Sequence, residues 1–197
     1  MAFNPPLAPT HSREKLVDVI IIVDMQVGLL NGVPKYDLHG VIERINSLTA
    51  MVRRRSGKVV WVRHCGKMGD PFEPHTAGWA FLPELIRQDD DIVIEKTLDD
   101  PFAGTLLKET LEQMTPGRVL VVGWATDFCV DATVRSAFSK DHHVVVVADG
   151  HTLSDRPHLK APIVIQHHNW VWSRLFTNRS IRVAKAAHLL DEDVQQA

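Results

Sequence analysis

Three side chains that can act together in nucleophilic chemistry each follow an apolar run of the chain. Asp24 ends a run rich in Val and Ile, Lys96 follows DIVIE, and Cys129 lies in GWATDFCVDAT. A thiolate attacks carbonyl carbon, a carboxylate can accept the thiol proton, and a lysine can stabilise developing negative charge. Together these residue types favour a thiol-dependent hydrolytic site. Taken singly, they also fit a turn cap, a solvated lysine and a buried, inert cysteine.

The sequence around Cys129 and Asp24 bears on their reactivity. A helix is predicted over about 127–140, which places Cys129 in a first helical turn, where the positive end of the dipole favours the thiolate. Burial would raise the pKa of Asp24 and a nearby cation would lower it, a balance that suits proton transfer. We therefore expect an acidic thiol beside a base.

Apolar runs alternate with amphipathic stretches along the whole chain. Four stretches have helical spacing, and the short runs between them are apolar on both faces, which is typical of strands covered on both sides. The sequence therefore predicts an α/β fold with three layers: a doubly wound (Rossmann-like), mostly parallel, six-stranded sheet between helices. The predicted strands are 16–23, 59–62, 92–94, 119–122, 144–148 and 180–184, and the predicted helices 41–55, 104–114, 127–140 and 159–176.

Polar residues follow five of the predicted strands, at the point where each strand ends. They are Asp24, His64, Lys96, the segment 123–129 and the segment 149–151. The carboxyl ends of parallel strands lie on one edge of a sheet, and ligands bind there. The strand assignment alone thus predicts one polar rim that contains all three candidate reactive groups.

Composition limits the class of protein. Apolar residues make up 45% and charged residues 23% of the 197 residues, and the formal charge is −2, so we expect one globular domain at 16–197 after an arm at 1–15. That charge does not favour nucleic-acid binding, and no apolar run suits a membrane span or a signal peptide. Cys65 and Cys129 match neither a zinc spacing nor a CxxC pair, which favours a reducing, cytoplasmic compartment and no cofactor.

Three segments in order, VDMQ, EKTLDDPFAGT and GWATDFCVDAT, resemble the isochorismatase-like cysteine hydrolases. That superfamily includes nicotinamidases, N-carbamoylsarcosine amidohydrolase, biuret and ureidoacrylate hydrolases, and isochorismatases. The resemblance covers about 17–151 and implies a catalytic group of Asp24, Lys96 and Cys129. It also implies an oxyanion hole of the backbone N–H groups of Ala125 and Cys129, and a cis peptide bond between Trp124 and Ala125.

The resemblance implies a reaction as well. The thiol of Cys129 attacks an amide, carbamoyl or ureido carbonyl, a thioester forms, and water hydrolyses it. The D-x-H metal motif of nicotinamidases is absent after the second predicted strand, so we expect a metal-independent enzyme that cleaves a C–N bond. An isochorismatase-type vinyl-ether hydrolase, in which Cys129 is dispensable, is the alternative within the enzyme class. A thiol sensor or a binding scaffold without hydrolysis is the alternative from another class.

Four residues are candidates for contact with a small amide or ureide substrate: His64, Trp79, Trp124 and Phe102. Each also fits simple packing at the rim or in the core. Many proteins of this kind are oligomers, so we expect a homodimer or homotetramer, with 169–176 as a candidate contact because it contains two tryptophans. The adjacent pair His167 and His168 points to different sides of a helix, which favours packing or an interface over metal binding.

Overall fold

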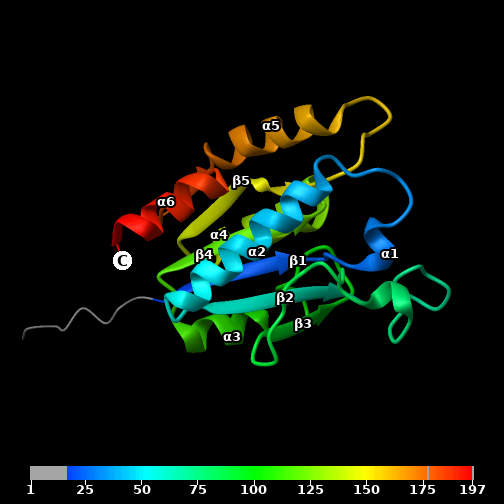
Figure 1. Cartoon of the computed structure of the whole chain (residues 1–197), viewed down its shortest axis with the longest axis horizontal. Coiled ribbons are helices and arrows are strands. Elements are labelled where there is room, and N and C mark those ends of the chain that lie inside the picture. The colour runs from blue at the N-terminus through cyan, green and yellow to red at the C-terminus, as the bar shows by residue number, and fades with distance from the viewer. Residues whose placement is uncertain (1–16, 177, 197) are drawn as a thin grey trace, which may run out of the picture.

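The computed structural model of the protein describes residues 17–176 and 178–196, so the predicted arm at 1–15 lies outside the described residues (Figure 1). Its centre is a six-stranded sheet of order β3-β2-β1-β4-β5-β6, in which every neighbouring pair is parallel. This confirms the predicted α/β fold class. The strands are β1 (Asp18–Val23), β2 (Lys58–His64), β3 (Ile92–Lys96), β4 (Arg118–Trp124), β5 (Val144–Thr152) and β6 (Ile181–Ala184).

The apolar strands are buried on both faces, as their composition requires. In β1 every residue is buried, and successive side chains enter two different cores. Ile20 and Ile22 pack on one face, whereas Val19, Ile21 and Val23 pack on the other. Because successive strand residues point to opposite faces, an unbroken Val/Ile run fills both layers at once.

Helices cover both faces of the sheet (Figure 1). Helices α2 and α6 pack on one face, α3 and α4 pack on the other, and α5 lies alongside β5. The helices are α1 (Val27–Leu30), α2 (Leu38–Arg54), α3 (Leu107–Met114), α4 (Asp131–Ser139), α5 (Ala161–Trp172) and α6 (Ala186–Gln196). None of the helices in the described part of the chain is long and apolar enough to cross a membrane.

One predicted boundary was wrong in a way that matters for the site. Strand β5 extends to Thr152, so the segment 149–151 lies inside the strand and does not follow it. The helix predicted over about 127–140 is present, but its first turn is an irregular turn, Thr126–Val130, with π-helical hydrogen bonding, and the regular helix α4 begins at Asp131.

The segment predicted as a contact between copies contributes partly to the core of a single chain. Trp172 is fully buried, and its indole N–H donates to Oδ1 of Asp131 at 2.7 Å. Trp172 is therefore unavailable for an interface, which corrects that part of the prediction. Trp170 and Phe176 remain exposed.

Candidate active site

The carboxyl edge of the sheet brings Asp24, Lys96 and Cys129 together. Nζ of Lys96 lies 2.7 Å from Oδ2 of Asp24 and 3.2 Å from Sγ of Cys129. The side chains of Asp24 and Lys96 have no exposed surface, and Cys129 is 4% exposed. Three groups that are distant in sequence thus form one buried cluster, as the parallel-strand argument predicts.

The Lys96 ammonium makes two further contacts. Its Nζ lies 3.1 Å from Nδ1 of His64 and donates to the carbonyl oxygen of Leu98 at 3.0 Å. An ammonium has only three protons and accepts no hydrogen bond, so four acceptors compete for them and Nδ1 of His64 must be an acceptor. The remaining proton of a neutral His64 ring is therefore on Nε2.

The backbone at the end of β1 directs Asp24 into this cluster. Asp24 has a left-handed φ of 49°, and its N–H donates to the carbonyl of Val62 on β2 at 3.0 Å. On the neighbouring strand, Gly123 has a φ of 125°, and a Cβ there would lie 2.2 Å from the carbonyl oxygen of Val23. Only glycine therefore lets β4 approach β1 this closely beside the site.

Cys129 lies in the irregular turn that joins β4 to α4. The peptide bond between Trp124 and Ala125 is cis, and the N–H of Val130 then donates to the carbonyl of Ala125 at 3.1 Å. Phe128 has non-helical backbone angles (φ −124°, ψ −106°). Cys129 directly follows this kink, and the helical turn Thr126–Val130 continues into α4 at Asp131. Cys129 therefore lies in the first turn of the helix, as the sequence predicts.

The acid–base properties of the cluster follow from its burial. Burial raises the pKa of Asp24 above its usual value, against the opposing effects of Lys96, Cys129 and His64. Burial and the Asp24 carboxylate also raise the pKa of the Cys129 thiol, although Lys96 acts in the other direction. The resting thiol is thus protonated, not acidic as we expected, and it lies beside a carboxylate whose basicity is increased.

His64 completes the polar part of the site. Burial and the Lys96 ammonium lower the pKa of His64, so the imidazole is neutral near pH 7. Its ring meets Phe72 edge to face, with 5.3 Å between centroids. Asp24, His64 and Cys129 each offer a metal-ligating atom within 4.8 Å of the others. The Lys96 ammonium contacts all three residues, however, so a positive charge already occupies the centre of this group.

The other predicted substrate contacts lie in different surroundings. Phe102 is buried in the same core as Cys129. The ring of Trp79 lies under the guanidinium of Arg63, whose carbon is 3.3 Å from the ring centroid. Trp124 packs with the cores on the α2 side and near α5, whereas Cys129 belongs to the core on the other face. His64 contacts the cluster through Lys96, and substrate contact by all four residues stays a prediction.

Sequence reasoning did not assign a role to two residues near the cluster. Gln26 is fully buried, and its side chain bonds the backbone N–H and carbonyl of His64 at 2.7 and 3.0 Å and the carbonyl of Trp79 at 3.1 Å. Gln26 therefore anchors both the end of β2 and the loop after it. Asp99 lies on the other side, where the Cys129 thiol donates to its Oδ1 at 3.5 Å. Both residues lie in motifs that sequence comparison singles out, VDMQ and EKTLDDPFAGT, but spacing alone does not reveal these contacts.

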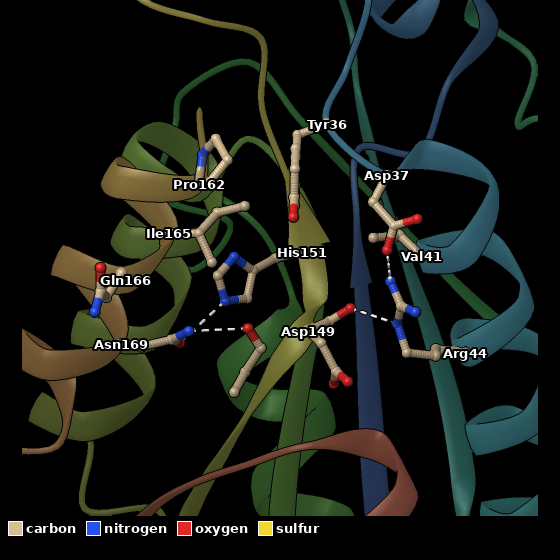
Figure 2. A pocket seen from close by; sticks show the side chains of 11 residues that line it. Tyr36, Asp37, Val41, Arg44, Asp149, His151, Pro162, Ile165, Gln166 and Asn169 are labelled. Atoms are coloured by element: carbon tan, nitrogen blue, oxygen red, sulfur yellow. Dashed lines mark hydrogen bonds and ion pairs between the residues drawn. The ribbon is translucent and has the colours of Figure 1, made fainter. Parts of the chain in front are cut away.

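A separate cavity of about 320 Å³ lies between the start of α2 and the start of α5, over the end of β5 (Figure 2). Arg44 forms an ion pair with Asp37 there and donates to the carbonyl of Asp149 at 2.6 Å. His151 and Asn169 form part of the opposite wall, where Nε2 of His151 lies 3.2 Å from Oδ1 of Asn169. None of the three clustered residues lines this cavity.

An all-parallel doubly wound sheet with Asp24, Lys96 and Cys129 at its carboxyl edge matches the class of hydrolase predicted from the sequence motifs. The Isochorismatase domain model matches residues 18–165, and the chain belongs to this family of hydrolases.

Individual relatives support the same assignment. A streptothricin hydrolase from Streptomyces noursei is 31% identical over 153 residues, which are 76% of this chain and 60% of that protein. The chain thus matches only about three fifths of that relative's length. An ureidoacrylate amidohydrolase from Methylorubrum extorquens is 26% identical over 66% of this chain and 68% of its own. The crystal structure of an isochorismatase from Pseudomonas putida KT2440 superposes with a TM-score of 0.80 at 26% identity, covering 94% of this chain and 93% of that one.

Proposed function

We propose that the protein is a metal-independent cysteine hydrolase that cleaves a C–N bond of a small amide, carbamoyl or ureido compound through a thioester. The observation that carries this proposal is the buried contact of Lys96 with both Asp24, at 2.7 Å, and Cys129, at 3.2 Å. An amidohydrolase among the relatives supports the choice of C–N cleavage.

In the first half of the reaction, the Asp24 carboxylate accepts the thiol proton as Sγ of Cys129 attacks the carbonyl carbon. The raised pKa of Asp24 makes the carboxylate a better acceptor than an ordinary aspartate. The C–N bond then breaks, Asp24 returns the proton to the departing nitrogen, and a thioester remains on Cys129. The backbone N–H groups of Ala125 and Cys129 are the proposed donors to the oxyanion.

In the second half, Asp24 accepts a proton from water, and the resulting hydroxide attacks the thioester carbonyl carbon. The C–S bond breaks, the carboxylic acid or carbamate departs, and the sulfur regains the proton from Asp24. Lys96 keeps its ammonium between the two negative centres throughout. This fixed cation lowers the energy of both the thiolate and the carboxylate without any reorganisation during the reaction.

The position of Lys96 also supports the absence of a metal from this mechanism. A metal bound by Asp24, His64 and Cys129 would have to displace an ammonium that contacts all three residues. Two like charges at contact distance repel strongly in a buried site. The lysine therefore takes the electrostatic role that a metal ion plays in other hydrolases.

Ammonia release tests the proposal on a panel of nicotinamide, biuret, ureidoacrylate, maleamate and N-carbamoyl amino acids. We expect at least one compound to be hydrolysed, and Cys129→Ala to lower kcat/KM by about 10⁴-fold or more, because the nucleophile is lost. Cys65→Ala is the matched control, since Cys65 is the chain's only other cysteine. Full turnover in Cys129→Ala would reject the thioester and favour a vinyl-ether hydrolase. A lack of hydrolysis on the whole panel, with a peroxide-sensitive Cys129, would favour a thiol sensor.

We also infer that the protein works as a homodimer or homotetramer. Trp170 and Phe176 support this inference, because these large apolar side chains are 60% and 103% exposed near the end of α5. Sedimentation velocity at micromolar concentration tests it, and a monomer would reject it.

A further inference from the structure

Asp99 is the feature of the site that the proposed mechanism leaves unused. It lies in the loop directly after β3, and its side chain is exposed while its Oδ1 lies 3.5 Å from Sγ of Cys129. The neighbouring carbonyl of Leu98 accepts a hydrogen bond from Lys96, which fixes this loop against the catalytic cluster. The next aspartate, Asp100, has a structural role, since it accepts hydrogen bonds from Phe102 N–H at 2.9 Å and from the Ser136 hydroxyl at 2.5 Å.

The charge of Asp99 is not balanced within the described part of the chain. The Lys96 ammonium is paired with Asp24, and no lysine, arginine or histidine in the described residues forms an ion pair with Asp99. Arg156, beside the irregular turn, is paired with Asp127 at 2.5 Å. Two carboxylates and one ammonium therefore surround the sulfur, which leaves a net negative charge on the solvent side of the nucleophile.

The position of Asp99 relative to the sulfur determines which part of a substrate lies beside its carboxylate. Any acyl group that becomes bonded to Sγ must lie within a few ångströms of it, and Oδ1 of Asp99 lies at 3.5 Å. The substituent on the scissile carbonyl therefore passes beside an unpaired carboxylate. A neutral substituent displaces water from the Asp99 carboxylate and offers no interaction in place of that hydration. An anionic substituent is repelled by the carboxylate, and a cationic substituent forms an ion pair with it.

We propose that Asp99 is a specificity-determining residue that selects substrates with a positively charged group, an ammonium, amidinium or guanidinium, near the scissile carbonyl. This inference rests on the proposed function, because it names the substrate class of the same site. A bound cation also offsets the charge of Asp99 when the thiolate forms. The selectivity is therefore expected in kcat/KM as a whole and not in binding alone.

The electrostatics can be tested at the thiol itself, independently of any substrate. In a Cys65→Ser background, Cys129 is the only thiol of the chain. It is labelled with aminoethyl, hydroxyethyl and sulfonatoethyl methanethiosulfonates, which are cationic, neutral and anionic, and each rate is divided by the rate for free 2-mercaptoethanol. We expect the cationic reagent to react at least about fivefold faster than the anionic one, and Asp99→Asn to remove most of that difference.

The rate ratio within one variant cancels any change in the thiolate fraction or in folding. Asp99→Glu is expected to keep the preference and Asp99→Lys to invert it. Glu95→Gln is the matched control, since Glu95 is an exposed carboxylate on the same strand end but is paired with Arg63 at 2.6 Å. Two results would overturn the inference. One is the same ratio of cationic to anionic labelling rates with Asp99 intact and in Asp99→Asn, and the other is a faster reaction with the anionic reagent while Asp99 is intact.

Hydrolysis of charge-matched amides separates this inference from the proposed function. The probes are β-alaninamide, butyramide and succinamate, which share one chain length and carry positive, zero and negative charge. We expect the kcat/KM ratio of the cationic to the neutral amide to exceed about fivefold in the wild type and to approach one in Asp99→Asn. Hydrolysis without this preference would reject the role of Asp99 and leave the amidohydrolase intact. Turnover that survives Cys129→Ala would reject the proposed function, whereas the thiol-labelling ratio would still decide on Asp99.

Discussion

Two buried polar networks lie near the carboxyl end of the sheet, and they differ in charge. Around Lys96, an ammonium contacts the Asp24 carboxylate and the Cys129 thiol. Around His151, the ring joins neutral groups only: Nδ1 lies 2.9 Å from Oγ1 of Thr126 and Nε2 lies 3.2 Å from Oδ1 of Asn169. The first network holds charged groups in competition for protons, and the second holds neutral groups whose hydrogen bonds are satisfied.

The cavity of about 320 Å³ borders the neutral network, because His151 and Asn169 both line it (Figure 2). Burial lowers the pKa of His151 to about 4, so the ring is neutral at physiological pH. Asn169 accepts from Nε2 and donates to the carbonyl of Ala148 at 2.9 Å, which fixes both its amide and the imidazole tautomer. Neither the presence of a cavity nor the burial of a histidine therefore identifies the reactive site. The useful signal is a buried charge with a nucleophile beside it.

The largest difference between the networks is expected for removal of the proton acceptor. Asp24→Asn retains the shape of the side chain but cannot accept the thiol proton, so we predict a loss of about 10⁴-fold in kcat/KM. Asp18→Asn is the matched control, because Asp18 is a buried aspartate at the opposite end of the same strand, paired with Arg118 at 2.6 Å. Steady-state kinetics on the amide from the panel measures both. Comparable losses in the two variants would mean that the effect is structural.

Removal of the ammonium is expected to reduce stability next most strongly. Lys96→Met leaves the Asp24 carboxylate buried and unpaired, so the free energy of unfolding in urea should fall by about 3–5 kcal/mol. The double variant Asp24→Asn/Lys96→Met removes both charges and should recover much of that loss while remaining inactive. If the double variant is as unstable as Lys96→Met, the ion pair is not the cause.

The neutral network should affect stability through pH. His151 takes up a proton near pH 6.5 in the unfolded chain but only near pH 4 in the folded protein, so the unfolded state binds more protons between these values. The free energy of unfolding should therefore fall by roughly 3 kcal/mol as the pH drops through this window. Urea unfolding of His151→Leu should show a flatter slope between pH 4.5 and 7. His39→Gln, at an exposed histidine, is the control, and an unchanged slope in His151→Leu would reject this description of the network.

The smallest effect is a shift in the acid limb of the pH–rate profile. Activity requires the Asp24 carboxylate, and burial raises its pKa, so kcat/KM should begin to fall at a pH above 3.8, the ordinary value of an aspartate. His64 also lies in the site, and His64→Gln distinguishes the two groups. A limb that persists in His64→Gln belongs to Asp24, whereas its disappearance would assign it to the imidazole.

The sequence predicts the sheet well because burial on both faces leaves a strong signal. An unbroken Val/Ile run such as β1 is typical of a strand in a parallel sheet that helices cover on both faces. Because the strands are parallel, Asp24 and Lys96 then lie on the same edge of the sheet. The motif around Cys129 adds the third member of the cluster. The meeting of Asp24, Lys96 and Cys129 could therefore be predicted from residue types, strand ends and family resemblance together.

Other features depend on backbone detail that periodicity does not contain. The non-helical angles of Phe128 kink the helix beside Cys129, just before α4 begins. The extension of β5 draws His151 into the sheet, and an amphipathic C-terminal helix, α6, was missed. The contact between Asp99 and the sulfur results from the path of a loop, and side-chain spacing in the sequence cannot predict it.

The central claim is that Cys129 forms a covalent bond with the substrate, while Asp24 transfers the proton and Lys96 stabilises the negative charges. Acid quenching during turnover, followed by peptide mass spectrometry, tests this claim most directly. The account predicts that the peptide containing Cys129 gains the mass of the acyl group in the wild type and that the Cys129→Ala protein gains none. Steady turnover with no adduct on Cys129, together with full activity of the alanine variant, would contradict it.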